Sequence, residues 1–365
     1  MNEKIRKIGA ALLAAVWVVL ILTAWFKPAG EFSDTERRPL DQMPSLKGQT
    51  LLNGKFMSEF EDYTLDQFPL RDGFRQLKSL FHYYVLNQKD NNGIYIADGY
   101  AAEMEYPLDE ASVQRAVQQF NKIYESYLKE SGSRVVCAVI PDKSYYLAEE
   151  NGYLTMDYES MFSQVREGMP WATHVDITEQ LRIADYYYTD THWRQERILP
   201  VAQKLAEALG VTAPRAEDFN QRALERPFYG VYYGQAALPM ESETMYVLEN
   251  ALISGCRVYN HETGKYAPVY DPEKLNAKDP YDVFLSGAQS LLTVTNPNAS
   301  TDRELIVFRD SFASSLIPLL LQDYATVTLV DIRYMSPELL GRFLEFKGQD
   351  VLFLYSTLVL NKKLI

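Results

Sequence analysis

Three short apolar segments in the last third of the chain decide the fold: Glu304–Phe308 (ELIVF), Ala325–Val330 (ATVTLV) and Asp350–Ser356 (DVLFLYS). Each has the length and the near-continuous apolar character of a strand that is covered on both faces. The two stretches between them, 312–321 and 337–346, are mostly apolar or apolar along one side, which predicts helices. Strand–helix–strand–helix–strand predicts an α/β fold with a parallel sheet and helices on both faces.

The same alternation begins earlier in the chain. Apolar residues at helical spacing predict a helix over 109–130, and an apolar strand follows at 134–140. A further helix is expected at about 193–209. The stretch at about 211–300 is rich in Tyr, Gly, Asn and Pro, and we interpret it as loops and short strands inserted into the α/β core. Cys137 lies inside the 134–140 strand and is expected to be a core residue rather than half of a disulfide.

The N-terminus predicts a membrane anchor. Residues 8–26 (IGAALLAAVWVVLILTAWF) carry no charge, and as a helix they would span roughly 28 Å, close to the thickness of a bilayer core. Lys4, Arg6 and Lys7 precede the segment, so residues 1–7 should remain in the cytoplasm and the rest should lie outside the cell membrane. A cleaved signal peptide is the alternative. The absence of a small-x-small cleavage site before Lys27 favours an uncleaved, single-pass signal anchor.

The exported part has two regions. Residues 27–50 are polar and contain three prolines, which predicts a tether, and residues 51–365 are expected to form the α/β domain. The whole chain has 36 Lys and Arg against 49 Asp and Glu, a net charge of −13. This balance argues against nucleic acid as a partner, because neutralising phosphates requires a surplus of basic residues. The sequence also lacks the glycine-rich nucleotide-binding motifs, and no cofactor is predicted.

Polar residues follow the predicted strands where parallel strands place a ligand site, at their carboxyl ends. Lys143 follows the 134–140 strand, Arg309, Asp310 and Ser311 follow the 304–308 strand, and Asp331 follows the 325–330 strand. Ser311 also precedes a predicted helix, where free backbone N–H groups favour a developing oxyanion. The simpler interpretation is that Asp310 or Ser311 only caps that helix.

A serine nucleophile needs a base, and His192 is the strongest of the four histidines. Asp190 precedes it by two residues, a spacing that lets a carboxylate accept from the ring Nδ1–H while Nε2 faces Ser311. Two alternatives stay open. Asp190 or Thr191 would merely cap the next helix, or Asp190 and His192 would bind a metal together with Asp310 or Asp331, although one histidine and carboxylates make a poor zinc site.

At this point the sequence resembles a known family. Thr189-Asp190-Thr191-His192-Trp193 resembles the signature of the DHHW family of exported bacterial proteins, and Arg309-Asp310-Ser311-Phe312 resembles the D-S-[FY] turn of the same family. The resemblance covers about residues 35–360. It extends to the SGNH-hydrolase-like group that includes the alginate acetylation proteins. Two positions depart from the pattern: Thr191 replaces the second residue of the signature, and Arg309 replaces the glycine of G-D-S.

The resemblance implies a Ser-His-Asp triad of Ser311, His192 and Asp190. It also implies O-acetyl transfer to, or removal from, an extracellular polysaccharide or cell-wall glycan, beside a membrane-embedded acyl donor protein. Gly287 and Gln289 are candidates for the oxyanion site. Arg309 and Lys143 are candidates for substrate contact, since a cation at position 309 would either crowd the turn or bind an anionic substrate. The alternative is a non-catalytic envelope or glycan-binding assembly protein that keeps the fold.

Overall fold

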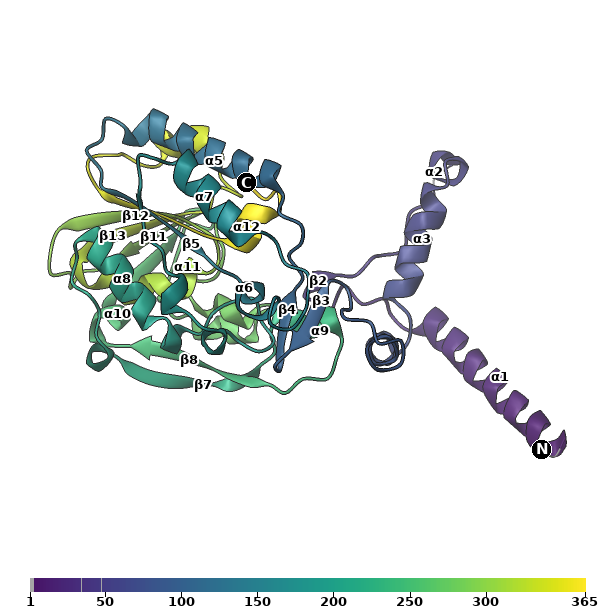
Figure 1. The fold of residues 1–365 in the computed structure, drawn as a ribbon. Helices are drawn as coiled ribbons and strands as arrows, with labels where there is room; N and C mark the ends of the chain where they lie inside the picture. The colour runs from purple at the N-terminus through teal and green to yellow at the C-terminus, as the bar shows by residue number, and fades with distance from the viewer. Residues whose placement is uncertain (1–2, 34, 47) are drawn as a thin grey trace. The chain divides into compact units, whose positions relative to one another are not determined.

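A computed structural model describes residues 3–33, 35–46 and 48–365 (Figure 1). Residues 1, 2, 34 and 47 lie outside the described residues, and they belong to the predicted cytoplasmic tip and the predicted tether. The chain divides into two compact units: unit 1 is Met1–Asn92 with Tyr233–Pro239, and unit 2 is Gly93–Tyr232 with Met240–Ile365. The unit that contains the α/β sheet begins at Gly93, later in the chain than the residue 51 expected from the sequence.

Unit 1 is mainly helical. Its elements are α1 (Glu3–Phe26), β1 (Phe32–Ser33), β2 (Arg38–Pro39), α2 (Gly48–Leu52), α3 (Lys55–Asp66), α4 (Arg71–Leu80) and the π-helical turn η1 (Phe81–Val85). Helix α1 is long enough and apolar enough to cross a membrane, as the sequence predicts.

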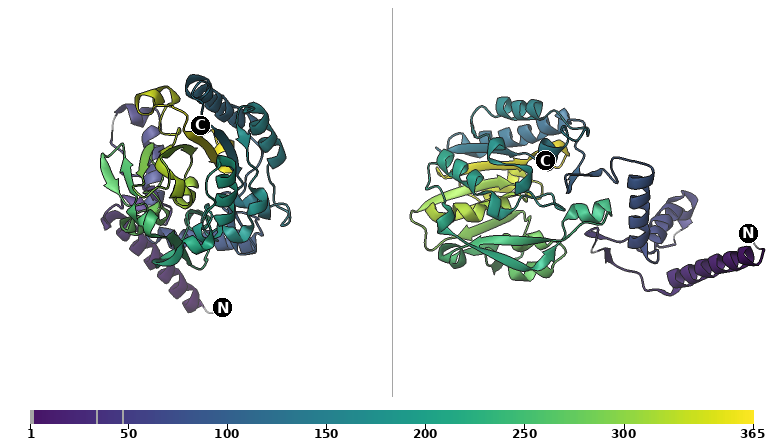
Figure 2. Two further views of the ribbon diagram at one scale, coloured as in Figure 1. Left: turned by 90° about the vertical axis from the view of Figure 1, so that its left-hand side faces the viewer. Right: turned by 60° about the horizontal axis from the view of Figure 1, so that its bottom comes forward.

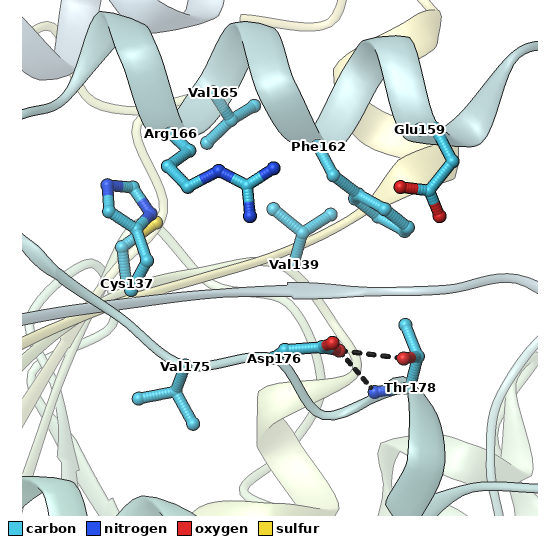
Figure 3. A pocket seen from close by; sticks show the side chains of 10 residues that line it. Cys137, Val139, Glu159, Phe162, Val165, Arg166, Val175, Asp176 and Thr178 are labelled. Atoms are coloured by element: carbon cyan, nitrogen blue, oxygen red, sulfur yellow. Dashed lines mark hydrogen bonds between the residues drawn. The ribbon is translucent and has the colours of Figure 1, made fainter.

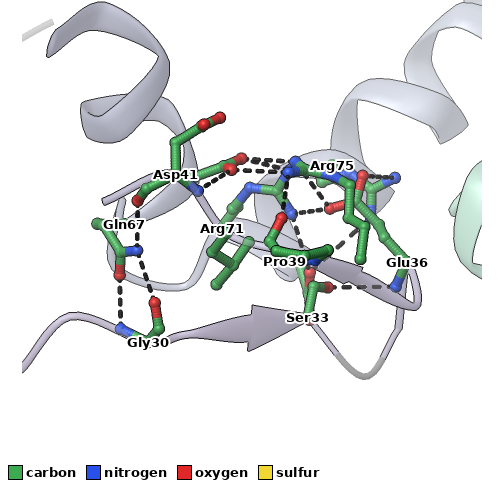
Figure 4. A network of polar contacts seen from close by, with 12 residues as sticks. Gly30, Ser33, Glu36, Pro39, Asp41, Gln67, Arg71 and Arg75 are labelled. Carbon is green, nitrogen blue, oxygen red and sulfur yellow. Dashed lines mark hydrogen bonds and ion pairs between the residues drawn. The ribbon is translucent and has the colours of Figure 1, made fainter. Parts of the chain in front are cut away.

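The predicted tether is folded where the structure describes it. Gly30 N donates to Gln67 Oε1 at 2.7 Å, and Gln67 Nε2 donates back to the Gly30 carbonyl at 2.9 Å (Figure 4). Arg38 binds both carboxylate oxygens of Asp66, at 2.6 and 2.7 Å. These contacts hold the segment after α1 against the end of α3. The polar composition of residues 27–50 predicted a tether. The sequence did not reveal these contacts, because pairings between distant residues leave no local signal.

Unit 2 is built around an eight-stranded sheet (Figures 1 and 2). In spatial order its strands are β10 (Lys265–Ala267), β9 (Arg257–Asn260), β11 (Leu291–Thr295), β13 (Tyr324–Val330), β12 (Arg303–Arg309), β14 (Asp350–Ser356), β5 (Val135–Ile140) and β6 (Thr173–His174). The five strands from β13 to β6 are parallel, and β10, β9 and β11 add to the β13 edge in antiparallel order. The stretch 211–300 is therefore more than an insertion, because three of its strands complete the main sheet.

Helices cover both faces of this sheet, as predicted. Leu352 and Leu354 of β14 pack into one apolar core, with α8 (Leu199–Leu209) and α11 (Ala313–Leu316). Val351 and Phe353 face the other core, with α5 (Glu110–Ile123) and α7 (Tyr158–Gly168). Successive strand residues point to opposite faces, so a strand buried on both sides must be apolar throughout. Cys137 lies in the second core as a free, buried thiol.

The remaining elements of unit 2 are short. Two further pairs of strands are β3 (Ile94–Ala97) with β4 (Tyr100–Glu103) and β7 (Asn220–Phe228) with β8 (Glu243–Glu249). The other helices are η2 (Tyr124–Leu128), α6 (Lys143–Leu147), η3 (Thr178–Gln180), η4 (Ile183–Asp185), η5 (Gln195–Arg197), η6 (Ala216–Asp218), α10 (Ala251–Gly255), η7 (Pro272–Asn276), η8 (Pro280–Val283), η9 (Ile317–Asp323), η10 (Pro337–Arg342) and α12 (Thr357–Asn361). A further helix, α9, spans Val231–Ala236.

Prolines and a glycine explain where predicted helices differ from observed ones. Pro200 lies in the first turn of α8, so the helix predicted from residue 193 begins at Leu199. Pro318 lacks an N–H donor, and the helix predicted over 312–321 passes from α11 into the 3-10 helix η9 at Ile317. The helix predicted over 337–346 is only the 3-10 helix η10, which contains Gly341, a poor helix former.

Candidate functional site

The turn that follows β12 places Ser311 at the carboxyl edge of the sheet. Asp310 is buried and fixes this turn: its Oδ1 accepts from Phe312 N at 3.0 Å, and its Oδ2 accepts from both the N–H and the hydroxyl of Ser356 at 2.7 Å. Asp310 thus ties the end of β12 to the end of β14. The N-cap residue of helix α11 is Phe312, and no side chain caps this helix, so neither Asp310 nor Ser311 has the capping role that the sequence left open. The half-buried Ser311 hydroxyl instead contacts His192.

His192 lies between Ser311 and Asp190. Its Nε2 is 2.7 Å from Ser311 Oγ, and its Nδ1 is 2.6 Å from Asp190 Oδ1. Asp190 and His192 are buried, with 1% and 6% of their surfaces exposed. With Nδ1–H donating to Asp190, Nε2 is left to accept the proton of the serine hydroxyl. The structure therefore brings Ser311 to a pair of residues that lie more than a hundred positions before it in the chain.

Aromatic side chains fix the plane of the imidazole. The Tyr281 ring stacks on the His192 ring with the centroids 3.9 Å apart and an angle of 7° between the planes. Phe312 contacts the imidazole as well, at 4.8 Å between centroids. Tyr281 is itself held, because its hydroxyl donates to Ser315 Oγ at 2.7 Å. A ring packed in this way loses little freedom when it must accept a proton along one direction.

Asp190 is positioned by two backbone donors. His192 N donates to its Oδ1 at 3.0 Å, and Val231 N donates to its Oδ2 at 2.9 Å. The residue before Val231 is Gly230, whose N–H donates to Thr189 Oγ1. A Cβ at position 230 would lie 2.3 Å from the Cα, Cβ and N of Asp190. Only glycine lets the 230–231 backbone approach closely enough to hold the carboxylate.

The variant Gly230→Ala should therefore displace Asp190 and misalign His192. We expect its rate of acyl-ester turnover to fall by about 100-fold, the scale of loss that follows a shift of about 1 Å in a reacting group. The measurement is steady-state turnover with thermal unfolding in parallel. Gly73→Ala is the matched control, because a Cβ at Gly73 meets nothing within 4 Å. Turnover at the parent rate in Gly230→Ala would show that the close approach is unimportant.

Two buried charged side chains clamp the segment that carries Asp190 and His192. Lys143 Nζ donates to the carbonyls of Tyr187 and Tyr188 at 3.0 and 3.3 Å. Glu243 Oε2 accepts from the N–H of Thr189 at 3.1 Å. Burial lowers the pKa of Lys143 to about 7, while the negative charges of Asp190, Glu243 and Asp142 oppose this shift. Lys143 does not lie at the rim as expected, because its ammonium is fully buried behind the site.

Lys143 gives the stability of the protein a specific pH dependence. In the unfolded chain its pKa returns to about 10.4, so between about pH 7 and pH 10 the unfolded state binds more protons than the folded state. The free-energy cost of burying the Lys143 ammonium is fully present below pH 7 and decreases as the pH rises and the folded protein loses this proton. We expect the parent to gain about 2 kcal/mol of unfolding free energy relative to Lys143→Met between pH 7 and pH 9. Denaturant unfolding of both proteins measures this.

The control for this prediction is Lys265→Met, which removes an exposed lysine of β10. Its difference from the parent should stay constant over the same pH range. A difference between the parent and Lys143→Met that is equally constant would contradict the pH-dependent burial cost.

Arg309, Gly287 and Gln289 hold neighbouring turns together. Arg309 is fully buried; its Nη2 donates to the Gly287 carbonyl at 3.0 Å and its Nη1 to Ser314 Oγ at 3.2 Å. The Gly287 N–H donates to the Phe284 carbonyl, and the Gln289 amide bonds Ser286 and Asn260. The structure therefore gives no support to anion binding by Arg309 or to oxyanion binding by Gly287 and Gln289. Arg309 does not crowd the turn, since its side chain extends toward Gly287.

In the part of the chain that the structure describes, neither a metal site nor the cavity beside α7 coincides with the site around His192. Among the described residues, no group of three or more His, Cys, Asp or Glu side chains is arranged to hold a metal ion. A cavity of about 100 Å³ lies beside α7, where Cys137, Phe162, Arg166 and Asp176 are among its lining residues (Figure 3). Asp190, His192 and Ser311 are not among the residues that line this cavity. The hydroxyl, imidazole and carboxylate therefore form a separate site.

The fold and the site together define a class. The mostly parallel sheet covered by helices is an SGNH-like α/β fold. At the carboxyl edge of this sheet, Ser311, His192 and Asp190 form a Ser-His-Asp arrangement. The model of the DHHW protein family matches residues 162–330, a range that contains all three residues. This match confirms the resemblance seen in the sequence. No curated protein sequence matches the chain.

Solved structures share the fold. A DHHW family protein from Eubacterium siraeum is 18% identical, and the match covers 74% of this chain and 93% of that chain with a TM-score of 0.61. PatB1 from Bacillus cereus is 17% identical over 74% of this chain and 98% of its own, with a TM-score of 0.60. A second structure of PatB1, with a sulfonyl adduct, is 16% identical over 74% and 96%, with a TM-score of 0.59. At these identities the likeness establishes the fold and not the activity.

Sequence reasoning missed the supporting residues of the site. The supporting residues lie far from the D-x-H segment in sequence, and their roles arise from tertiary contacts. They are Gly230, Val231, Glu243 and Tyr281. Gly230 in the segment Tyr229-Gly230-Val231 carried a weak signal, since a glycine between bulky residues often marks a close backbone approach. Tyr281 and Glu243 carried no comparable signal.

Proposed function

We propose that this chain is a serine-dependent O-acyltransferase or acylesterase, most specifically for acetyl groups, that acts on a cell-envelope or secreted polysaccharide. The observation that carries the proposal is the position of His192. Its Nε2 lies 2.7 Å from Ser311 Oγ, and its Nδ1 lies 2.6 Å from Asp190 Oδ1. This arrangement recurs on unrelated folds that catalyse acyl transfer. The shared SGNH-like fold is compatible with this chemistry but does not establish it.

The proposed reaction has two halves. Ser311 Oγ attacks the acyl carbonyl while His192 Nε2 takes the hydroxyl proton, and the imidazolium then returns that proton to the departing alkoxide. The acyl-serine that forms is attacked by a sugar hydroxyl, which gives transfer, or by water, which gives hydrolysis. In this second half His192 takes the proton of the incoming oxygen and returns it to Ser311. Asp190 holds the ring in the required tautomer and stabilises its positive charge.

The negative charge that develops on the carbonyl oxygen in the tetrahedral intermediate needs N–H donors. The Phe312 N–H already donates to Asp310 Oδ1, and the Ala313 N–H to the Asp310 carbonyl. We therefore assign the Ser311 N–H as the first oxyanion donor.

A non-catalytic assembly or glycan-binding role was favoured in the sequence by Arg309 in place of glycine. The position of the Arg309 side chain supports the catalytic proposal over this alternative. Arg309 is buried and directed toward Gly287, while the Ser311 hydroxyl keeps its contact with His192. The substitution of the glycine therefore leaves the geometry around the serine intact.

The proposal places the reaction outside the cytoplasm. Helix α1 would anchor the chain in the cell membrane, with the basic residues Lys4, Arg6 and Lys7 on the cytoplasmic side. A membrane-embedded protein would then supply the acyl donor to Ser311. Digestion of intact spheroplasts by an added protease tests the orientation: the bulk of the chain should be cleaved, and protection of unit 2 would contradict it.

The experiment that tests the function uses the full chain in detergent. A chromogenic acetyl ester serves as donor, with and without a hydroxyl-rich oligosaccharide as acceptor. Release of the chromophore supports an acyl-enzyme route, and mass spectrometry of the oligosaccharide separates transfer from hydrolysis. Neither chromophore release nor acetylated sugar, from a protein that unfolds cooperatively, would refute the proposal. The control is His261→Ala, which removes an exposed histidine whose ring bonds the Thr293 hydroxyl, and it should leave both readouts unchanged.

A further inference from the structure

Unit 1 contains an apolar groove between two of its own helices. The groove has a volume of about 460 Å³, and it lies between the second half of α1 and the apolar side of α3. Its lining includes Trp17, Ile21, Trp25, Phe60, Tyr63 and Phe68. The site around Ser311 lies in unit 2 and uses none of these residues.

Two of the polar side chains that reach this groove, Thr64 and Gln67, already have hydrogen-bond partners within the protein. Thr64 Oγ1 donates to the Glu61 carbonyl at 2.8 Å. The Gln67 amide both donates to and accepts from Gly30, and it donates to the Asp41 carbonyl at 3.0 Å as well. An occupant therefore gains little from carrying hydrogen-bonding groups of its own. The groove suits a purely apolar ligand.

The contacts of Gly30 fix the position of the groove along the length of α1. Gly30 is only four residues after Phe26, the end of α1, so the Gly30 backbone that bonds Gln67 lies within about 14 Å of the end of α1. The bidentate ion pair of Arg38 with Asp66 reinforces this attachment. The groove thus runs beside the half of α1 that ends at Phe26.

The membrane supplies the occupant. Helix α1 is 24 residues long, or about 36 Å, which exceeds the roughly 30 Å of a bilayer hydrocarbon core. Trp25 and Phe26 are 80% and 82% exposed at its end, where aromatic side chains favour the membrane interface. Residues 17–25 would then lie in the leaflet next to Phe26. Acyl chains are the abundant apolar groups at that depth.

We propose that the groove between α1 and α3 is a lipid site that binds an acyl chain of the leaflet next to Phe26. This inference rests on the proposed membrane anchoring by α1. It gives α3 a second role beside its contacts with the Gly30 segment: α3 lies partly in the membrane and presents Phe60 and Tyr63 to lipid.

Fluorescence quenching in liposomes tests the site in the full chain. Thr64→Cys places a polarity-sensitive fluorophore in the groove, Glu61→Cys places it one turn away outside the groove, and Val18→Cys places it on α1. Cys137 and Cys256 are buried, and the labelled parent measures their background. The liposomes are phosphatidylcholine with a nitroxide on the acyl chain. We expect the Thr64 label to show a blue shift and a loss of emission that match the Val18 label, and the Glu61 label to show neither.

The other outcomes overturn the proposal in distinguishable ways. If the Val18 label is quenched but the Thr64 label behaves like the Glu61 label, α1 is in the bilayer and the groove holds no lipid. If none of the three is quenched, the anchoring by α1 fails as well. A blue shift at Thr64 that disappears when protein is diluted in lipid would identify a second copy of the chain as the occupant. Acetyl-ester turnover by the same samples tests the proposed reaction separately.

Discussion

Replacing Ser311 by alanine is expected to lower acyl-ester turnover by roughly 10⁴-fold or more, since removing a nucleophile abolishes the covalent route altogether. The hydroxyl is the group that His192 Nε2 contacts at 2.7 Å, and the Ser311 side chain is only half-buried, so the change to alanine leaves no large cavity. Folding should be preserved, because Asp310 and not Ser311 makes the bonds that fix the turn.

The measurement for Ser311→Ala is initial velocity against ester concentration, with unfolding monitored in parallel. The matched control is Ser336→Ala, which removes an exposed serine before η10 and should retain the parent rate. Parent-like turnover in Ser311→Ala would mean that another group is the nucleophile.

Asp190→Asn is expected to lower turnover by about 10⁴-fold while the protein stays folded, as loss of the orienting carboxylate does in known Ser-His-Asp enzymes. The reason is a conflict of donors. If the asparagine NH₂ faces Val231 N, two donors meet where Val231 now bonds Asp190 Oδ2 at 2.9 Å. If the NH₂ faces His192 Nδ1, the ring proton moves to Nε2, which can then no longer accept from Ser311.

Two readouts check the Asp190→Asn prediction. Turnover should fall mainly in kcat, because substrate contacts are unchanged. Asp176→Asn removes a charge from an exposed carboxylate that bonds Thr178, and it should have a small effect. A drop of less than tenfold in Asp190→Asn would indicate that His192 does not depend on this carboxylate.

The central strands and the candidate site could be predicted because their signals are local. The segments of β12, β13 and β14 are apolar on both faces, and the polar residues that end them must meet at one edge of a parallel sheet. Asp190 and His192 are only two residues apart, so their pairing needed no knowledge of the fold. The contact with Ser311 followed from the position of that edge.

The features that were missed depend on contacts between distant residues. Strands β9 and β11 join the sheet beside β13 by antiparallel pairing. The Gly- and Pro-rich sequence of residues 211–300 did not predict this pairing. Arg309 and Lys143 were expected at a solvent-exposed rim, because charged residues are rarely buried without partners. Each instead donates to backbone carbonyls, of Gly287 and of Tyr187 and Tyr188, and such acceptors have no sequence signature.

The central claim is that His192 activates Ser311 for attack on an acyl group. Covalent labelling with a sulfonyl fluoride tests it most directly, because such a reagent reacts with a serine hydroxyl that a neighbouring base activates. The full chain is incubated with the reagent and digested, and the modified peptide is sequenced by mass spectrometry. We predict a single adduct on Ser311 that forms in the parent and is lost in His192→Ala. An unmodified Ser311 in folded protein, or an adduct that forms equally fast without His192, would contradict the account.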